Sequence, residues 1–123
     1  MKNMDLYKLK SLVEDQLTTS IAFVNSEGKP HNTPVWTHYS DGKLYIFSRK
    51  SRNKIKLAEE NPSCMLAFTN GAVSGEAEIV YRGTPEYESI MDLPDVRYSH
   101  DPNYTEYKQK WTAAIKITPT KIH

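Results

Sequence analysis

The sequence predicts a mainly β protein, an antiparallel barrel or sandwich with peripheral helices. Two observations lead to this fold class. Six short runs rich in β-branched and aromatic residues are separated by turn signals, and two amphipathic stretches interrupt them with helical spacing. The chain has 123 residues, which is the usual size of one domain, so residues 1–123 are expected to form a single domain.

The first half of the chain contains one predicted helix and two predicted strands. Met4–Gln16 is expected to be an amphipathic helix, because its apolar residues recur at spacings of three and four. Strands are expected over Thr18–Val24 and His31–Tyr39. Pro34 lies inside the second of these and has no N–H to donate, which indicates an edge, a bulge or a place where something other than a strand lies alongside.

A third strand and a second helix follow. Asp41-Gly42 is a strong hairpin signal, and it precedes the predicted strand Lys43–Ser48. The period then changes to that of a helix over Ser51–Glu60, with Ser51 as the expected N-cap.

The second half contains three more predicted strands, over Ser63–Thr69, Glu76–Gly83 and Thr112–Thr118. Between the last two, Pro85–Lys110 shows no clear strand, although Asn103–Trp111 could form a short helix. This segment is long for a loop, and it is expected either to cap a pocket or to pack on the surface.

Composition limits the function classes. The net charge is +1 and the hydrophobic fraction is 38%, below the usual value of about 45–50%. The aliphatic core is therefore expected to be thin, with the eight tyrosines covering part of it, a hint of self-association. Neither a nucleic acid nor a membrane surface is expected as partner, and no apolar run approaches a membrane span, so a cytoplasmic protein is expected.

Few residues suggest acid–base or metal chemistry. The lone Cys64 lies in an apolar run, which predicts a small buried residue. The alternative is a nucleophilic thiol. His31 and His38 are seven residues apart on one predicted strand and point to opposite faces. No metal site is expected, and the catalytic residues stay unassigned.

A basic run at the predicted start of the second helix is the best candidate site. It spans Ser48–Lys54 and combines hydroxyls and cations with the free N–H groups of a helix start. Such a combination suits a phosphate monoester, although a solvated helix face and a nucleic-acid patch are alternatives. Asn32–Trp36 forms a second candidate, because a strand interrupted by Pro offers backbone groups to a flat heterocycle; the alternative is a plain edge strand with Trp36 in the core.

The ordered motifs together resemble a known family. They begin at Gly28 and comprise His31–Trp36, Asp41–Ser48, Lys54, Leu57, Ala58, Asn61-Pro62 and the tail Trp111–Pro119. In this order the chain resembles the FMN-binding split-barrel family related to pyridoxamine 5′-phosphate oxidase. The resemblance implies a six-stranded antiparallel split barrel of Greek-key type with flanking helices. It also implies a homodimer with two FMN sites at the interface.

The resemblance also implies which residues hold the cofactor. The flavin ring and the ribityl chain would be lined, largely through backbone, by Asn32, Thr33, Pro34, Val35, Trp36 and Thr37. The phosphate end would be lined by Phe47, Ser48, the pair Asn53 and Lys54, and the supplementary cations Arg49 and Arg52. Trp111 would approach the ring from the partner subunit.

Two departures argue against pyridoxamine phosphate oxidation itself. The oxidase has Arg at the positions aligned with Asn32 and Asn53, and it has a substrate-binding extension after the last strand, whereas this chain stops at His123. The resemblance therefore implies an FMN-dependent oxidoreductase acting on another small molecule. The alternatives are a deazaflavin cofactor, a binding or sensing module for flavin or haem without turnover, and a nucleic-acid-binding barrel.

Overall fold

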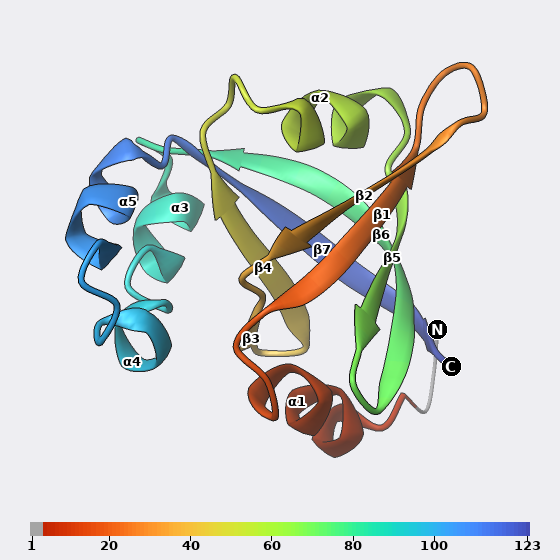
Figure 1. Ribbon diagram of the computed structural model, residues 1–123, viewed down its shortest axis with the longest axis horizontal. Coiled ribbons are helices and arrows are strands. Elements are labelled where there is room, and N and C mark those ends of the chain that lie inside the picture. The colour runs from red at the N-terminus through yellow and green to blue at the C-terminus, as the bar shows by residue number, and fades with distance from the viewer. Residues whose placement is uncertain (1–3) are drawn as a thin grey trace.

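The computed structural model describes residues 4–123 (Figure 1). Five helices and seven strands follow one another along these residues: α1 (Leu6–Glu14), β1 (Thr19–Val24), β2 (Pro30–Val35), β3 (His38–Ser40), β4 (Lys43–Ser48), α2 (Asn53–Glu60), β5 (Ser63–Phe68), β6 (Gly71–Tyr81), α3 (Pro85–Ile90), α4 (Asp95–Tyr98), α5 (Tyr104–Lys110) and β7 (Ala113–Ile122).

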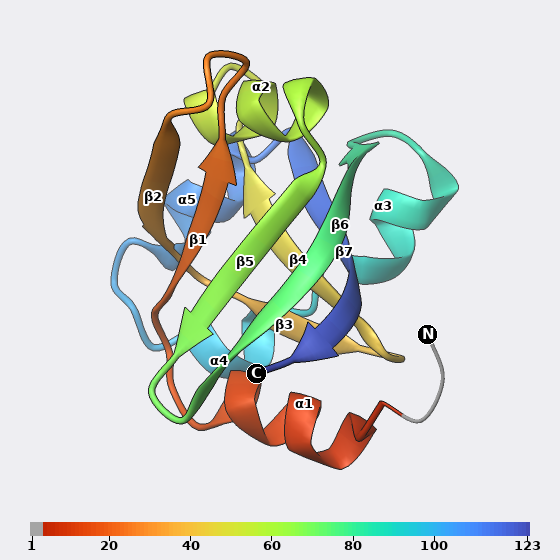
Figure 2. The same ribbon diagram turned by 90° about the vertical axis from the view of Figure 1, so that its right-hand side faces the viewer.

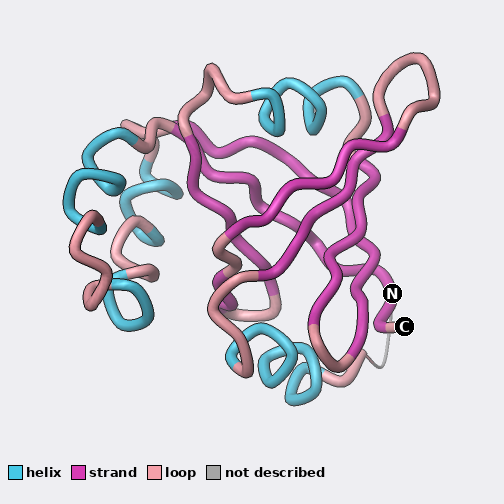
Figure 3. The backbone as a smooth tube through the Cα atoms, in the orientation of Figure 1, coloured by secondary structure: helices cyan, strands magenta, loops and turns pink. Residues whose placement is uncertain are grey.

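All seven strands belong to one antiparallel sheet with the order β2-β1-β5-β6-β7-β4-β3. The two edge strands, β2 and β3, are consecutive in the chain and are separated only by Trp36 and Thr37. The sheet must therefore curl until its edges approach each other, as the strand trace of Figure 3 shows. This curled sheet with flanking helices confirms the predicted split-barrel fold class.

Three local expectations are corrected. The predicted strand His31–Tyr39 divides into β2 and β3, so the sheet has seven strands instead of six. β6 begins at Gly71 rather than Glu76, because Gly75 lies inside the strand at a bulge. A Cβ atom on Gly75 would lie 2.6 Å from Cγ2 of Ile117, so a glycine here permits close strand packing and does not mark a turn. Helix α2 begins two residues after Ser51, and Arg52 is its N-cap residue.

The main core lies inside the barrel, and a helix covers each of its ends (Figure 2). α1 contributes Leu9, Leu12 and Val13 to this core, and α2 contributes Ile55, Leu57 and Ala58. The strands supply the remaining buried residues from every second position, for example along β5, where burial alternates strictly. α2 is thereby fixed over one end of the barrel.

A second cluster lies on the outer face of β4 and β7, under α3. It contains Tyr45, Phe47, Tyr87, Ile90 and Ala114 together with neighbouring residues. β4 is thus covered on both faces, which explains why Lys43–Ser48 reads as a continuous apolar run.

Four of the eight tyrosines are buried within the chain, namely Tyr45, Tyr87, Tyr98 and Tyr104. One of them lies on β4 and the other three lie on α3, α4 and α5. The tyrosine content by itself therefore does not point to self-association. In residues 4–123, no helix is long and apolar enough to cross a membrane.

Candidate functional site

A cavity of about 540 Å³ lies where β4 ends and α2 begins. Its walls come from β2, the end of β4, the following turn, α2 and α5. Nine of the thirteen residues that the sequence predicts for the cofactor site line it: Asn32, Thr33, Phe47, Ser48, Arg49, Arg52, Asn53, Lys54 and Trp111. The fold therefore gathers the basic run and the Asn32 region around one space.

The start of α2 presents free N–H groups at this cavity. Its N-cap residue, Arg52, has extended backbone (φ −74°, ψ 148°), and no side chain in the described chain accepts a hydrogen bond at this cap. The preceding turn is held to Thr112, the residue before β7, because the Lys50 N–H donates to Thr112 Oγ1 (2.9 Å) and the Thr112 N–H donates to the Ser48 carbonyl (3.0 Å). The first amides of α2 are thus oriented and available to an anion.

Positive charge dominates the lining. Arg49, Arg52, Lys54 and Lys110 line the cavity, and none of the described lining residues is a carboxylate. Lys54 is half-buried, and burial, followed by the nearby charge of Arg52, lowers its pKa. An anionic ligand would relieve the repulsion between these crowded cations and accept charge-assisted hydrogen bonds from them.

A second cavity of about 430 Å³ adjoins the first and has aromatic walls. Pro34, Val35 and Trp36 of the predicted set line it, and four side chains line both cavities: Phe47, Lys54, Tyr107 and Trp111. The two cavities therefore form one elongated site that passes from a cationic end to an aromatic end.

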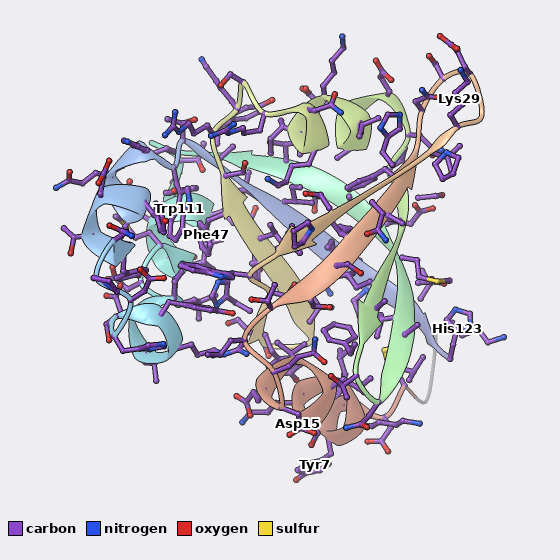
Figure 4. All side chains as sticks on the ribbon, in the orientation of Figure 1. Tyr7, Asp15, Lys29, Phe47, Trp111 and His123 are labelled. Carbon is purple, nitrogen blue, oxygen red and sulfur yellow. The ribbon has the colours of Figure 1, made fainter. Side chains whose placement is uncertain are left out.

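The aromatic rings of this region are closely packed. Figure 4 shows Phe47 and Trp111 on the side of β4 that faces α5, with ring centroids 5.5 Å apart and planes at 27°. Trp36 stacks on Tyr98 with centroids 4.0 Å apart, and the ring of Tyr107 meets Trp36 in a T-shaped arrangement with centroids 5.8 Å apart. These rings form flat walls of the kind on which a planar heterocycle stacks.

Thr37 is the predicted residue that lines neither cavity. It is buried, and its hydroxyl has no hydrogen-bond partner in the described chain; the same holds for both ring nitrogens of His38. The His38 ring lies between Phe47 and Tyr98, with centroids 5.7 and 5.2 Å away. Burial, aided by the charge of Arg97, lowers the pKa of His38 to about 3, so the ring is neutral at pH 7.

Arg97 locks the α3–α5 segment against the barrel. Its guanidinium donates to the carbonyls of Thr37 (2.5 Å), Val13 (2.8 Å) and Gln16. The adjacent Tyr98 carries the ring that stacks on Trp36. The segment expected either to cap a pocket or to pack on the surface therefore lines both cavities through α5.

Several lining residues were not predicted as site residues, chiefly His31 on β2 and Tyr107 and Lys110 on α5. His31 could have been found, because it lies two residues before Thr33 and so shares its side of the strand. Trp111 lines the cavity of its own chain beside Lys54, and its expected approach to the ring from a partner subunit stays a prediction. It follows α5 directly, and the short link from helix to β7 leaves it on this wall.

The remaining chemistry-bearing residues lie elsewhere. Cys64 is buried, its thiol donates weakly to the Gly75 carbonyl (3.6 Å), and burial raises its pKa to about 12. It therefore has the environment of a structural cysteine. Among residues 4–123 no cluster of three or more His, Cys, Asp or Glu could hold a metal ion.

The structure defines a split-barrel protein whose elongated cavity joins a cationic helix start to aromatic walls. The chain belongs to the Pyridoxamine 5'-phosphate oxidase family, whose sequence pattern it matches over residues 7–123. The resemblance inferred from the motifs is thus confirmed. No curated protein matches the chain.

Solved structures with the same fold have diverse descriptions. A FAD-binding protein from Mesorhizobium loti has a TM-score of 0.70 and 18% identity, with 97% of this chain and 92% of that one covered. The heme storage protein HutZ from Vibrio cholerae has a TM-score of 0.72 and 11% identity, with 95% and 92% covered. An F420 reductase has a TM-score of 0.69 and 23% identity, with 93% and 94% covered. At these identities the likeness shows the fold alone.

Proposed function

We propose that this protein binds FMN and acts, as a homodimer, as an oxidoreductase that transfers a hydride or electrons to or from a small molecule. One observation carries the proposal: the cationic cavity at the start of α2 continues into the aromatic cavity through shared side chains. FMN has the same order of parts, with a phosphate, a polar ribityl chain and a planar ring. Membership of the family supports this choice.

The phosphate would be bound at the β4–α2 turn. Lys54 and Asn53 would contact its oxygens, with Arg49 and Arg52 as supplementary cations and the first amides of α2 as further donors. Hydrogen bonds between charged partners are about twice as strong as neutral ones. The set fits a dianionic monoester, even though Asn32 and Asn53 stand at the two positions where the oxidase has Arg.

The ring would extend along β2 towards the aromatic cavity, lined by Thr33 to Trp36 and by Phe47 and Trp111. A bound flavin supplies hydride and electron transfer by itself, so the protein contributes binding, orientation and electrostatics. The Thr33 hydroxyl or a backbone N–H of β2 is placed in this proposal beside the ring edge, where a hydrogen bond would tune its potential.

The outer face of β2, β1 and β5 supports the homodimer. Cross-strand neighbours share one face of a sheet, and the outward rows on these strands contain no charged residue: Pro34, Ser20, Ala67; Asn32, Ala22, Met65; and Pro30, Val24. Val24 and Met65 are 40% and 41% exposed. A second copy on this face would lie against Asn32, and therefore at the edge of the proposed FMN cavity.

The test is a visible spectrum together with a mass in solution. Purified protein supplied with FMN is expected to absorb near 450 nm, about the maximum of an oxidised flavin, with one FMN per chain. Sedimentation of the loaded protein is expected to give twice 14.1 kDa. A colourless protein that takes up no FMN would refute flavin binding, and a flavin-loaded monomer would refute the homodimer.

The same measurement separates the alternatives. Stoichiometric FMN that no nicotinamide cofactor reduces would favour a binding or sensing module. Tighter binding of a deazaflavin than of FMN would identify the deazaflavin as the cofactor. Haem would give its own intense band. The histidines favour flavin over haem, because the His31 Nε2 already lies 3.2 Å from the Asn25 side-chain amide and both His38 nitrogens are buried.

Lys54→Ala is expected to weaken FMN binding by about 1.5–3 kcal/mol, because it removes a charge-assisted hydrogen bond to the phosphate. Fluorescence titration of FMN measures the change. Lys56→Ala is the matched control, since Lys56 lies exposed on the same helix and outside both cavities. Equal affinities for wild type and Lys54→Ala would remove Lys54 from the phosphate site.

A further inference from the structure

We propose that residues 92–110, which carry α4 and α5, form a lid over the aromatic end of the site and open as one unit to admit and release the ligand. Figure 1 shows α4 and α5 in a group of short helices beside the barrel. The inference rests on the proposed function where it names FMN as the ligand. The opening itself is a property of this chain and is measurable without a cofactor.

The lid is held together by its own side chains. The Tyr104 hydroxyl on α5 donates to the Asp95 carboxylate on α4. Lys108 Nζ on α5 lies 2.7 Å from Oδ1 of Asp92 and 2.8 Å from Oδ1 of Asp95. These bonds join α4, and the turn before it, to α5. The two helices are therefore expected to move together.

Little apolar surface fastens the lid to the barrel. Within residues 92–110 the buried residues are Pro94, Tyr98 and Tyr104. The attachment is mainly polar: Arg97 donates to three backbone carbonyls outside the lid, and the Tyr98 hydroxyl donates to the Leu17 carbonyl. Arg97 and Tyr98 together are the latch of the lid. Segments with few buried apolar contacts open locally, without unfolding of the whole domain.

Both ends of the lid are fastened, so the latch lies between two hinges. Leu93, at the first end, packs against the outer cluster under α3. At the other end, Arg82 donates to the carbonyls of Gln109 and Trp111. Opening would therefore move the middle of the lid, with its two latch residues, away from the barrel.

Polar atoms without a hydrogen-bond partner lie under the closed latch. They are the Thr37 hydroxyl oxygen and both ring nitrogens of His38, all buried in the described chain. The Tyr98 ring lies 5.2 Å from the His38 ring, and Arg97 donates to the Thr37 carbonyl. An unpartnered buried polar group destabilises the state that buries it. Opening would give these atoms water, so the latch holds the lid closed against that cost.

The closed lid also blocks the aromatic cavity for a planar ligand. Tyr107 of the lid meets Trp36 of the barrel with ring centroids 5.8 Å apart, and Tyr98 stacks on Trp36 at 4.0 Å. A planar ring between two aromatic walls needs about 3.5–4 Å on each face, hence about 7–8 Å between the walls. The lid must therefore move away from Trp36 before such a ring can pass between them.

Hydrogen exchange of the cofactor-free protein at pH 7, followed by mass spectrometry, tests the opening. The amides of α4 and α5 are expected to exchange together and roughly tenfold or more faster than those of β6 and β7. Arg97→Met is expected to speed exchange about a hundredfold in α5 as well as in α4, whereas His38→Phe and Thr37→Val slow it about tenfold. Lys10→Met and His31→Phe, both at exposed positions outside the lid, are the controls.

Three results would overturn the lid. Fraying of separate short helices would leave α5 unaffected by Arg97→Met, because Arg97 lies on α4. Opening only by global unfolding would give equal exchange in α4, α5 and β6. Faster exchange in His38→Phe would mean that the imidazole helps to hold the lid closed, the reverse of the argument from its unpartnered nitrogens.

Stopped-flow fluorescence of FMN tests whether the lid is the route to the site. In His38→Phe, association and release are both expected to slow about tenfold, while the dissociation constant stays within about threefold of wild type. In Arg97→Met both rates are expected to rise by the factor that hydrogen exchange shows. Unchanged rates, or a changed affinity without matched rates, would overturn the gating role. A protein that takes up no FMN refutes the proposed function, and hydrogen exchange still decides the lid.

Discussion

Replacing Arg97 with Met is expected to lower the free energy of unfolding by about 3 kcal/mol. Arg97 donates to three carbonyls, those of Val13, Gln16 and Thr37, and hydrogen bonds to a charged donor contribute more than neutral ones. Two of these carbonyls lie at or just beyond the end of α1, where a cation also interacts favourably with the helix dipole. Urea denaturation at pH 7 measures the loss.

Arg82→Met is the matched control for this prediction. Arg82 also donates to two carbonyls, those of Gln109 (3.2 Å) and Trp111 (2.8 Å), but it is exposed. Water can therefore replace it, and a loss below about 1 kcal/mol is expected. Arg97→Lys retains the charge without the planar fork and is expected to fall between the two. Equal stability of Arg97→Met and wild type would show that Arg97 does not lock the α3–α5 segment.

A contact of Arg97 explains why the division of His31–Tyr39 into two strands was not predicted. The stretch from His31 to Tyr39 has the composition of one strand, and Pro34 does not end it, because β2 is an edge strand that pairs only with β1. The strand ends after Val35 instead, and the Thr37 carbonyl accepts from Arg97, sixty residues later. No local pattern contains that contact.

Elements that depend on local sequence patterns could be predicted. The hairpin at Asp41-Gly42, where both residues have positive φ, and the strand Lys43–Ser48 were predictable from turn chemistry and apolar content. The basic run could be assigned to a helix start because the sequence changes to a helical period over Ser51–Glu60. Tyr107 and Lys110 could not be assigned to the site, since only the packing of α5 against the barrel brings them to the cavity.

The buried His38 ring leads to the prediction with the strongest pH dependence. In the folded protein burial and Arg97 lower its pKa from 6.5 to about 3, whereas the unfolded chain takes up the proton near pH 6.5. Between these two values the unfolded state binds more protons. Stability therefore falls as the pH falls through this window, by about 1.4 kcal/mol per unit, and the contribution of His38 is fully retained above pH 6.5.

The expected loss from His38 alone between pH 6.5 and pH 4 is about 3 kcal/mol. His38→Phe is expected to remove this dependence, because phenylalanine fills the space between Phe47 and Tyr98 without a titrating group. Subtracting the two denaturation series isolates His38 from the carboxylates, which titrate in both proteins. His31→Gln, at an exposed position, is the control and is expected to follow wild type. Parallel curves for wild type and His38→Phe would mean that the imidazole finds a partner or reaches water in the folded protein.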